Sequence, residues 1–443
     1  MVSLGCPKNL VDSEVMLAAL EQAGYRMVEE AEQASLVLIN TCGFIQPAVE
    51  EAIDTVLTLA AVKEEHPEQL LVVTGCMVQR YGNALIDELP EVDLFVGLDD
   101  FYRIHELVNS IRPEKRAVVN PGAGTYLMDH TVARHLATPS YRSFLKITEG
   151  CSNRCAYCMI PSIRGPLRSR TIADLTAEAI LLEQRGVREL SLIAQDLTAY
   201  GHDLVEPASL VQLLDSILDN TSIPWIRLLY AYPSGITDSL LQMMAGQPRI
   251  LPYIDVPFQH ASNRVLAAMN RHYRQATLDD LVQRIRLHIP DCAIRTTILI
   301  GFPGETEEDV ETLIDSLERW ELDHVGVFQY QDEEGSDAAE LPAKVSDEEK
   351  ESRYHRVMST QAAISARRQH RFIGRVEPVL VEGVSSESDL LLEGRTRYQA
   401  PEIDGCVYIT SGEVNPGDIV SVRITEAHTY DLVGEVLEKK QGN

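Results

Sequence analysis

The sequence predicts a three-part α/β protein: an N-terminal α/β domain with a parallel sheet, a central partial barrel of six βα units, and a small C-terminal all-β barrel. Short apolar runs alternate with helical stretches over the first hundred residues and again from about residue 139, which is typical of parallel sheets. After residue 373 short runs stand between glycines and prolines instead, which indicates an all-β module.

Residues 1–110 are expected to form the N-terminal domain. Its predicted strands are the apolar runs Leu36–Asn40, Leu70–Thr74 and Asp93–Val96. Helices are expected from Pro47 to about Lys63, since proline suits a first helical turn, and from the second strand to about Leu89. Residues 111–138 are rich in proline and glycine and poor in large apolar residues, so we expect a linker or an inter-domain strand arm there.

The central domain is expected over residues 139–373. Its predicted strands are Phe144–Thr148, Leu190–Ala194, Ile226–Tyr230, Tyr253–Phe258, Ile294–Ile300 and Val325–Tyr330. Helical stretches separate them; the one over Glu307–Trp320 starts with a capping box of Thr306 and Asp309. Six consecutive βα units favour an incomplete barrel over an eightfold one. A long charged helix over 345–373 leads into the β module of residues 374–443, for which we expect a five-stranded barrel.

Composition limits the class of protein. No apolar run of about 18 residues is present, and the first residues lack the pattern of a signal peptide, so we expect a cytoplasmic protein without a membrane span. The net charge of −28 disfavours nucleic acid as a partner and favours a basic protein, although acidity can also serve solubility alone. Eight cysteines in such a chain indicate metal binding or catalysis rather than disulfides.

Three cysteines form a compact group in EGCSNRCAYCMIP. Cys151, Cys155 and Cys158 directly follow the predicted strand Phe144–Thr148, at the barrel rim where catalytic groups gather. Three thiolates are one short of the four that a cubane iron–sulfur cluster usually has, which leaves one iron open to a substrate. The alternatives are a zinc site completed by His or Asp, and three unconnected core cysteines.

The Cys-x3-Cys-x2-Cys loop, with the aromatic Tyr157 before its last cysteine, resembles the signature of the radical S-adenosylmethionine superfamily. The resemblance implies a 4Fe–4S cluster whose open iron binds S-adenosylmethionine, and one-electron cleavage of that cofactor to a 5′-deoxyadenosyl radical. Besides Tyr157, it implies contacts to S-adenosylmethionine from Gln195 and Asp196, which end a predicted strand, and from Gly301 in ILIGFPGET. A plain strand-end turn also explains Gln195 and Asp196, and a turn before a helix explains Gly301.

The other group consists of Cys6, Cys42 and Cys76. Each follows a strand-like run directly (VSLG, LVLINT and LVVTG), so in a parallel sheet all three would lie at the carboxyl edge, where ligands bind. Glycines beside each cysteine would allow close backbone approach. The trio therefore can converge on one site, but buried cysteines are also common at strand ends.

The strings GCPKNLVDSE, NTCGFI and GCM resemble the N-terminal domain of the methylthiotransferases, and the resemblance spans nearly the whole chain. It implies that Cys6, Cys42 and Cys76 hold a second 4Fe–4S cluster, again with an open iron, so that two clusters and S-adenosylmethionine serve one reaction. In this family the radical removes a hydrogen from the substrate carbon, and sulfur from the second cluster couples to it. The resemblance also implies two partners, an electron donor such as a flavodoxin and a sulfur source. It does not identify residues that act as general acid or base.

Family members modify either transfer-RNA adenosine or an aspartate of the twelfth small-subunit ribosomal protein. The C-terminal module resembles the TRAM domain, an RNA-binding barrel, yet residues 374–443 hold six Lys or Arg against thirteen Asp or Glu, a net charge of −7. The negative charge favours a basic ribosomal protein as substrate. The string GRTRYQAPEIDG also resembles the aspartate-modifying branch. The alternatives are a transfer-RNA methylthiotransferase and a non-catalytic iron–sulfur carrier.

Several further residues are expected near the site or away from it. Tyr230, Tyr232, Gln259 and His260 end predicted strands and are candidates to line the cavity. Arg164, Arg168 and Arg170 form a basic tract that is either a solvated surface or an attractor for a carboxylate. The two remaining cysteines, Cys292 and Cys406, are expected in the core.

Overall fold

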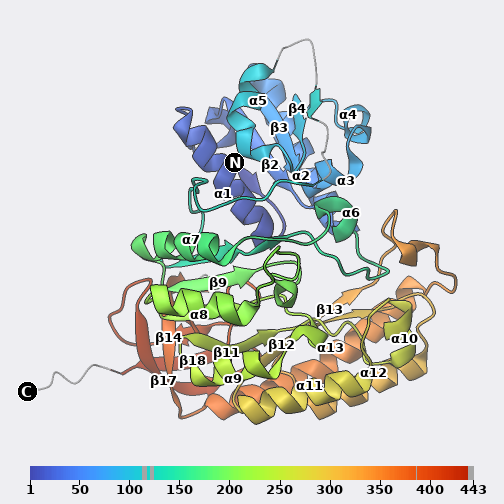
Figure 1. The fold of residues 1–443 in the computed structure, drawn as a ribbon, viewed down its shortest axis with the longest axis vertical. Helices are drawn as coiled ribbons and strands as arrows, with labels where there is room; N and C mark the ends of the chain where they lie inside the picture. Colours follow the sequence, from blue (N-terminus) through green and yellow to red (C-terminus); the bar gives the residue numbers. More distant parts are fainter. Residues whose placement is uncertain (112–116, 120–123, 386, 438–443) are drawn as a thin grey trace, which may run out of the picture.

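The computed structural model describes residues 1–111, 117–119, 124–385 and 387–437. The N-terminal domain (blue in Figure 1) lies above the central domain (green to orange), and the C-terminal barrel (red) lies against the amino ends of the central strands. Within these residues no helix is both long and apolar enough to cross a bilayer.

The N-terminal domain contains the expected parallel sheet, in the order β1-β2-β3-β4-β5. Its strands are Val2–Ser3, Leu36–Thr41, Leu70–Gly75, Leu94–Val96 and Ala117–Val119, so the sheet includes one strand from the segment expected as a linker or strand arm. Its helices are α1 (Pro7–Gln22), α2 (Gln46–Glu65), α3 (Cys76–Tyr81), α4 (Ala84–Glu88) and α5 (Ile104–Ser110). The helical stretch expected up to Leu89 is divided into α3 and α4, because Gly82 adopts a positive φ of 53°.

The central domain is an open, all-parallel sheet in the order β13-β12-β11-β10-β9-β6. Its strands are β6 (Arg142–Lys146), β9 (Glu189–Ile193), β10 (Trp225–Leu228), β11 (Ile250–Asp255), β12 (Ala293–Ile300) and β13 (His324–Gln329). Its helices are α6 (Ile160–Arg164), α7 (Ile172–Gln184), α8 (Leu210–Asn220), α9 (Asp238–Gly246), α10 (Asn263–Ala268), α11 (Gln275–His288), α12 (Glu307–Trp320) and α13 (Asp347–Gln369). The prediction of six βα units is confirmed, as is the capping box of Thr306 and Asp309 on α12.

A two-stranded ribbon of β7 (Thr148–Glu149) and β8 (Arg168–Ser169) follows β6 and frames the cysteine loop. Because all six strands of the central sheet run in parallel, their carboxyl ends share one rim, and the loops after them gather there. The large buried cluster between sheet and helices, which includes Leu192, Ile226 and Leu317, makes this rim a rigid platform.

The C-terminal module is the predicted five-stranded barrel, closed in the order β14-β15-β16-β18-β17. Its strands are Val376–Ser385, Ser388–Thr396, Val407–Ile409, Ile419–Ala427 and Leu432–Val436, numbered β14 to β18 in chain order. It is joined to the central sheet by a buried cluster of charges in which Glu189 accepts hydrogen bonds from Arg227 and Arg395. The barrel is therefore fixed to the central sheet through β9 and β10.

Candidate functional site

The loop of Cys151, Cys155 and Cys158 is held in place by backbone hydrogen bonds. The amide of Cys151 donates to the carbonyl of Gly165 (3.1 Å), and that of Cys158 donates to the carbonyl of Cys155 (3.0 Å). Gly150, before the loop, has a φ of +69° and lies against Pro166, so that a side chain there would collide with backbone. The three thiols are thus presented at the rim by a stiff turn.

Arg271 is the cation beside this trio. Its Nη1 lies 3.3 Å from the Cys155 sulfur, while its Nε donates to the Tyr273 hydroxyl (2.7 Å) and its Nη2 to the Pro257 carbonyl (2.7 Å). Burial and the neighbouring thiol of Cys155 raise the pKa of Cys158 to about 12. Metal coordination stabilises such buried thiols as thiolates, since a bound cation replaces the lost solvation.

Cys6, Cys42 and Cys76 meet at the carboxyl edge of the N-terminal sheet. Cys6 is the N-cap of α1, Cys42 follows β2, and Cys76 begins α3 directly after β3. A Cβ atom added at Gly5 would lie 2.9 Å from Cβ and 3.4 Å from Sγ of Cys42, so the turn that carries Cys6 packs against the turn that carries Cys42. The expected convergence of these turns is present in the structure.

Two further glycines, Gly43 and Gly75, pack closely against the backbone beside this trio. A Cβ at Gly43 would lie 2.6 Å from the Met77 nitrogen and 2.7 Å from the Cys76 carbonyl carbon. Gly75 has a φ of +102° and touches the backbone of Thr41. Because only glycine fits at these positions, the sequence preserves the approach of the three cysteine-bearing turns.

The trio of Cys6, Cys42 and Cys76 lies in a positive environment. Burial alone would raise the pKa of Cys6, but the charges of Lys8 and Arg164 and two backbone amides hold that pKa below its ordinary value. Burial raises the pKa of Cys76 to about 12, in spite of the charge of Arg164 and a hydrogen bond from it. The thiol of Cys76 also lies 3.5 Å from Oδ1 of Asn9.

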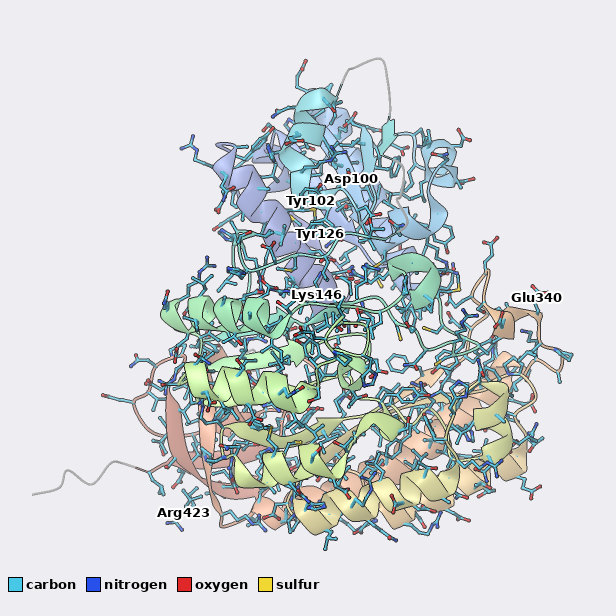
Figure 2. All side chains as sticks on the ribbon, viewed as in Figure 1. Asp100, Tyr102, Tyr126, Lys146, Glu340 and Arg423 are labelled. Atoms are coloured by element: carbon cyan, nitrogen blue, oxygen red, sulfur yellow. The ribbon has the colours of Figure 1, made fainter. Side chains whose placement is uncertain are left out.

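Arg164 links the two trios across the domain boundary. It ends α6, shortly after Cys158, and its Nη2 donates to Asn9 Oδ1 (2.6 Å) and Asp12 Oδ2 (2.9 Å) on α1. Its Nη1 donates to Glu149 (3.0 Å). Lys146, labelled at this boundary in Figure 2, pairs with both Asp12 and Glu149. These charges are buried, so they tie the N-terminal domain firmly to the rim of the central sheet.

Two further contacts close the boundary. Cys76 belongs with Leu98, Met159 and Ile163 to one small apolar cluster, so the segment after Cys158 packs into the same cluster as a cysteine of the other trio. On the far side, Arg80 of α3 pairs with Glu333 (2.8 Å), in the loop after β13. The two trios therefore face the same inter-domain space, as expected if both serve one reaction.

Neither trio is compact enough for a single metal ion. Among the described residues, the one group of three or more potential ligands whose atoms all lie within 4.8 Å of one another is Asp129, His130 and Asp174, away from both trios. Thiolates on one zinc ion, about 2.3 Å from the metal, would lie closer together than that. Wider spacing fits a cluster in which each thiolate binds a different iron, which disfavours the zinc alternative.

The residues expected near S-adenosylmethionine differ in their surroundings. Both amide atoms of Gln195 are buried without a hydrogen-bond partner among the described residues. Asp196 instead accepts from Asn153 of the cysteine loop (2.7 Å) with one oxygen and caps the turn at Thr198 (3.0 Å) with the other. The structure thus leaves Gln195 available to a ligand and gives Asp196 a supporting contact with the loop.

Tyr157 and Gly301 occupy the opposite side of the rim. Tyr157 packs on the small apolar cluster around Phe302 and Tyr330, and burial raises the pKa of its hydroxyl well above its ordinary range. Gly301 has a φ of +71°, donates its amide to Glu305 (2.9 Å), and lies against the side chain of Lys350. Its conformation and this contact both require glycine.

Some residues lie where the sequence did not place them. Arg164 and Arg170 are buried and form ion pairs in the interior, so they do not belong to a solvated surface tract. Cys292 is buried as expected, whereas Cys406 is only half-buried. His260 is fully buried beside Glu305 and does not face the trios as a free side chain.

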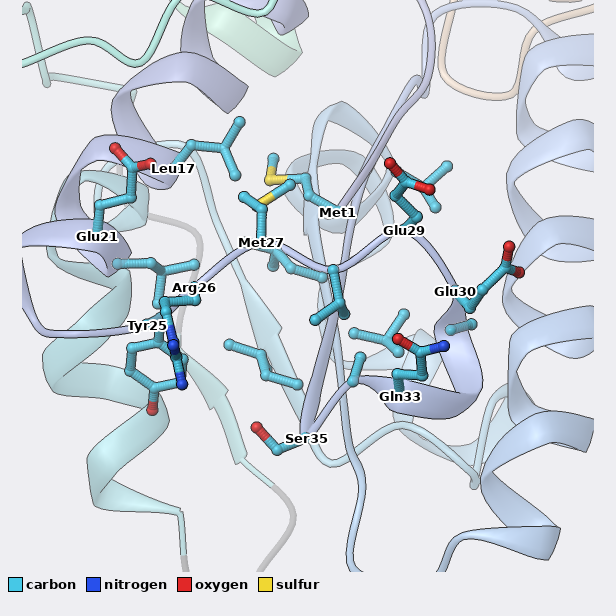
Figure 3. A pocket seen from close by; sticks show the side chains of 18 of the residues that line it. Met1, Leu17, Glu21, Tyr25, Arg26, Met27, Glu29, Glu30, Gln33 and Ser35 are labelled. Carbon is cyan, nitrogen blue, oxygen red and sulfur yellow. The ribbon is translucent and has the colours of Figure 1, made fainter.

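A separate surface cavity of about 510 Å³ lies in the N-terminal domain (Figure 3). Met1, Leu17, Tyr25 and Met27 are among its lining residues, and none of the cysteines is. It is bounded by the first residues of β2, whereas Cys42 follows the last one, so the cavity lies at the amino ends of the strands. It is therefore distinct from the candidate site.

Comparison with known families matches each part of the chain to a model. Residues 1–97 match the uncharacterised protein family UPF0004, residues 145–317 match the radical SAM superfamily, and residues 373–437 match the TRAM domain. Among solved structures, the radical S-adenosylmethionine methyltransferase TsrM from Kitasatospora setae is similar in fold, with a TM-score of 0.58 at 15% identity over 76% of this chain and 74% of that one. The radical SAM fold of the central domain is thereby confirmed.

Curated relatives match over nearly the full length. The ribosomal protein uS12 methylthiotransferase RimO of Desulfotalea psychrophila is 53% identical over 99% of this chain and 98% of its own length. The protein of the same name from Geobacter sulfurreducens is 48% identical over the same shares. With two cysteine trios facing one inter-domain space, the chain belongs to the family of ribosomal protein uS12 methylthiotransferases named RimO.

Proposed function

We propose that this protein is a radical SAM methylthiotransferase that adds a methylthio group to the β-carbon of an aspartate in ribosomal protein uS12. The observation that carries the proposal is the meeting of two cysteine trios across the boundary bridged by Arg164. In this proposal Cys151, Cys155 and Cys158 hold one 4Fe–4S cluster, and Cys6, Cys42 and Cys76 hold the other. S-adenosylmethionine binds beside the cluster held by Cys151, Cys155 and Cys158.

The residues present fit these groups. Each trio offers three thiols, and the part of the chain that the structure describes groups no fourth cysteine with either, which suits a cluster with one open iron. The unpartnered amide of Gln195, buried near the rim, supplies a donor and an acceptor for the polar end of S-adenosylmethionine. Asp196, which holds Asn153, and Gly301 and Tyr157 would form the walls of the same pocket.

When bound, the clusters and S-adenosylmethionine supply an electron, a carbon radical and reactive sulfur, which a carbon without an activating group requires. The chain's own contribution is position and exclusion of water. Arg271 holds the Cys155 sulfur by a charge-assisted contact, and Arg164 fixes α1 against the central domain. Leu98, Met159 and Ile163 keep the side of Cys76 dry.

The charge of the molecule supports a basic protein as substrate. The whole chain carries −28 and the C-terminal module −7, so the approach of a basic ribosomal protein is accelerated and that of RNA is opposed. The proposal also includes a cytoplasmic location, a flavodoxin-like electron donor, a separate sulfur source, and domains at residues 1–110, 139–373 and 374–443 joined by the linker 111–138.

The test is anaerobic reconstitution followed by assay on isolated uS12. We expect about two cubanes of bound iron, and one methylthio group on an aspartate of uS12 by mass spectrometry. Cys42→Ala and Cys155→Ala should each remove about half of the iron, and Cys155→Ala should abolish 5′-deoxyadenosine formation. Cys292→Ala, at a buried position far from both trios, is the matched control.

Two results would contradict the proposal. Thiomethylated adenosine in transfer RNA, with unmodified uS12, would show the transfer-RNA activity instead. Clusters that are reduced but do not cleave S-adenosylmethionine would show an iron–sulfur carrier.

A further inference from the structure

Lys8 is a buried cation for which the described residues provide no ion pair. It lies in the first turn of α1, two residues after Cys6, and only 8% of the residue is exposed. Within the described part of the chain its ammonium forms no hydrogen bond and no ion pair. Its close contact is with the face of the Tyr230 ring, whose centroid lies 3.2 Å from Nζ.

The fold does not explain a lysine at this position. A cation in the first helical turn opposes the helix dipole, and α1 has no acidic residue in that turn to balance it. Burial of an ammonium without a partner also costs free energy. Lys146, the other buried lysine at this boundary, is by contrast paired with Asp12 and Glu149. Lys8 thus has Cys6, Asp255 and Glu149 in its electrostatic surroundings but no ion pair with any of them.

The ammonium of Lys8 lies among charged groups of both domains, since Cys6, Arg164 and Glu149 all act on it electrostatically. Tyr230, which lies under it, follows β10 at the rim and has a φ of +66°, a strained conformation for tyrosine. The backbone there is fixed on both sides, because the Tyr230 amide donates to Asp255 (3.1 Å) and its carbonyl accepts from Leu197 (2.9 Å). The ring therefore holds Lys8 at the rim of the central sheet.

The two carboxylates that act on Lys8, Asp255 and Glu149, are already bound by other cations. Asp255 accepts from Arg295 (2.9 Å), and Glu149 is shared by Lys146 and Arg164. Both act on Lys8 electrostatically, but neither forms an ion pair with it, so its ammonium keeps its hydrogen-bond donors for another anion.

We propose that Lys8 binds the side-chain carboxylate of the substrate aspartate. The inference rests on the proposed function, since an aspartate is the residue to be modified, and it assigns the group that selects it. One charge-assisted hydrogen bond to the carboxylate would hold the adjacent β-carbon between the two trios. Asparagine, which is nearly the same size, would leave the ammonium buried without a counter-charge and would be rejected.

The test compares two peptides on the reconstituted holoenzyme. Both span the modified site of uS12, located by mass spectrometry, and they differ only in aspartate or asparagine at that site. We expect wild-type protein to bind the aspartate peptide about 10- to 100-fold more tightly, the range for one hydrogen bond to a charged group. Lys8→Met should remove this preference, and Lys8→Arg should keep most of it.

The controls separate recognition from assembly. Lys63→Met removes a positive charge from the same domain, at a lysine that pairs with Asp93, and should keep the full preference. Iron content and the electron paramagnetic resonance spectrum are measured for every variant, so that a change of preference is taken only from protein whose clusters have assembled.

Several outcomes would overturn the inference. One is a wild-type protein that binds both peptides equally, which requires no variant. Another is a Lys8→Met protein that binds both peptides more weakly by the same factor. A third is a Lys8→Arg protein that loads iron normally but no longer prefers the aspartate peptide. If wild-type protein modifies no aspartate at all, the proposed function fails instead, and this outcome is distinct from the other three.

Discussion

Glu189 provides a direct test of how the C-terminal barrel is attached. This carboxylate begins β9 and is 1% exposed; it accepts from Arg227 Nε (2.6 Å) and Arg395 Nη2 (2.6 Å). Burial by itself would raise its pKa, but the charges and hydrogen bonds of Arg395 and Arg227 lower it from 4.5 to about 2. We expect Glu189→Gln, which keeps the shape and removes the charge, to destabilise the protein substantially.

Two estimates of the size agree. A pKa lowered by this amount corresponds to about 3 kcal/mol of folding free energy at neutral pH. Removing one partner from a buried ion pair costs about 3–5 kcal/mol, because Arg227 and Arg395 would stay buried with less compensation. Since the folded-state pKa lies below the unfolded one, the stabilisation is complete above about pH 4.5 and is lost as the pH falls toward about 2.

The assay is urea unfolding of the metal-free protein, followed by circular dichroism at pH 7, pH 5 and pH 3.5. Glu189→Gln should lower the free energy of unfolding by about 3 kcal/mol at pH 7 and by clearly less at pH 3.5. Glu311→Gln, whose exposed carboxylate pairs with Arg356, is the control and should cost less than about 1 kcal/mol. A loss below about 1 kcal/mol in Glu189→Gln, or a loss that does not change with pH, would refute the reasoning.

Three further variants test the site itself. Gly43→Ala places a Cβ against the backbone that leads from Cys76 and should remove about half of the reconstituted iron, whereas Gly246→Ala, with open space around it, should bind iron normally. Gln195→Ala should weaken S-adenosylmethionine about 10-fold in anaerobic calorimetry, at unchanged iron content; equal affinity would contradict its assignment. Arg271→Met removes the cation at Cys155 and should lower the cluster's reduction potential by on the order of 50 mV in a spectroscopic titration; an unchanged or higher potential would contradict this.

Local sequence patterns predicted much of the fold. Six apolar runs marked the central strands because parallel strands are buried on both faces, and the Thr306 box marked the start of α12. The alternation of strand and cysteine also predicted that Cys6, Cys42 and Cys76 meet at one edge. Such patterns need only neighbours in the chain and the rule that parallel strands end together.

Contacts between distant segments could not be predicted in the same way. Arg164 is 152 residues from Asp12, and nothing near either one in the sequence indicates that they form a pair. From sequence alone, Arg164 could be a solvated surface residue or a group that attracts a carboxylate. In the structure, the packing of the two domains buries it. The isolation of Lys8 was also hidden, although a lysine in a first helical turn without a nearby acid is a signal that can be searched for.

Helix α1 sets the spacing between the two cysteine trios, which are the proposed metal centres. One end bears Cys6 as its N-cap, and two turns further on Asp12 and Glu14 are bonded to Lys146 and Arg134 of the segments that lead into the other centre. A helix advances a fixed 1.5 Å per residue and resists compression, so the gap between the centres cannot drift with thermal motion of loops. The two cysteine trios would therefore keep one spacing without a domain movement.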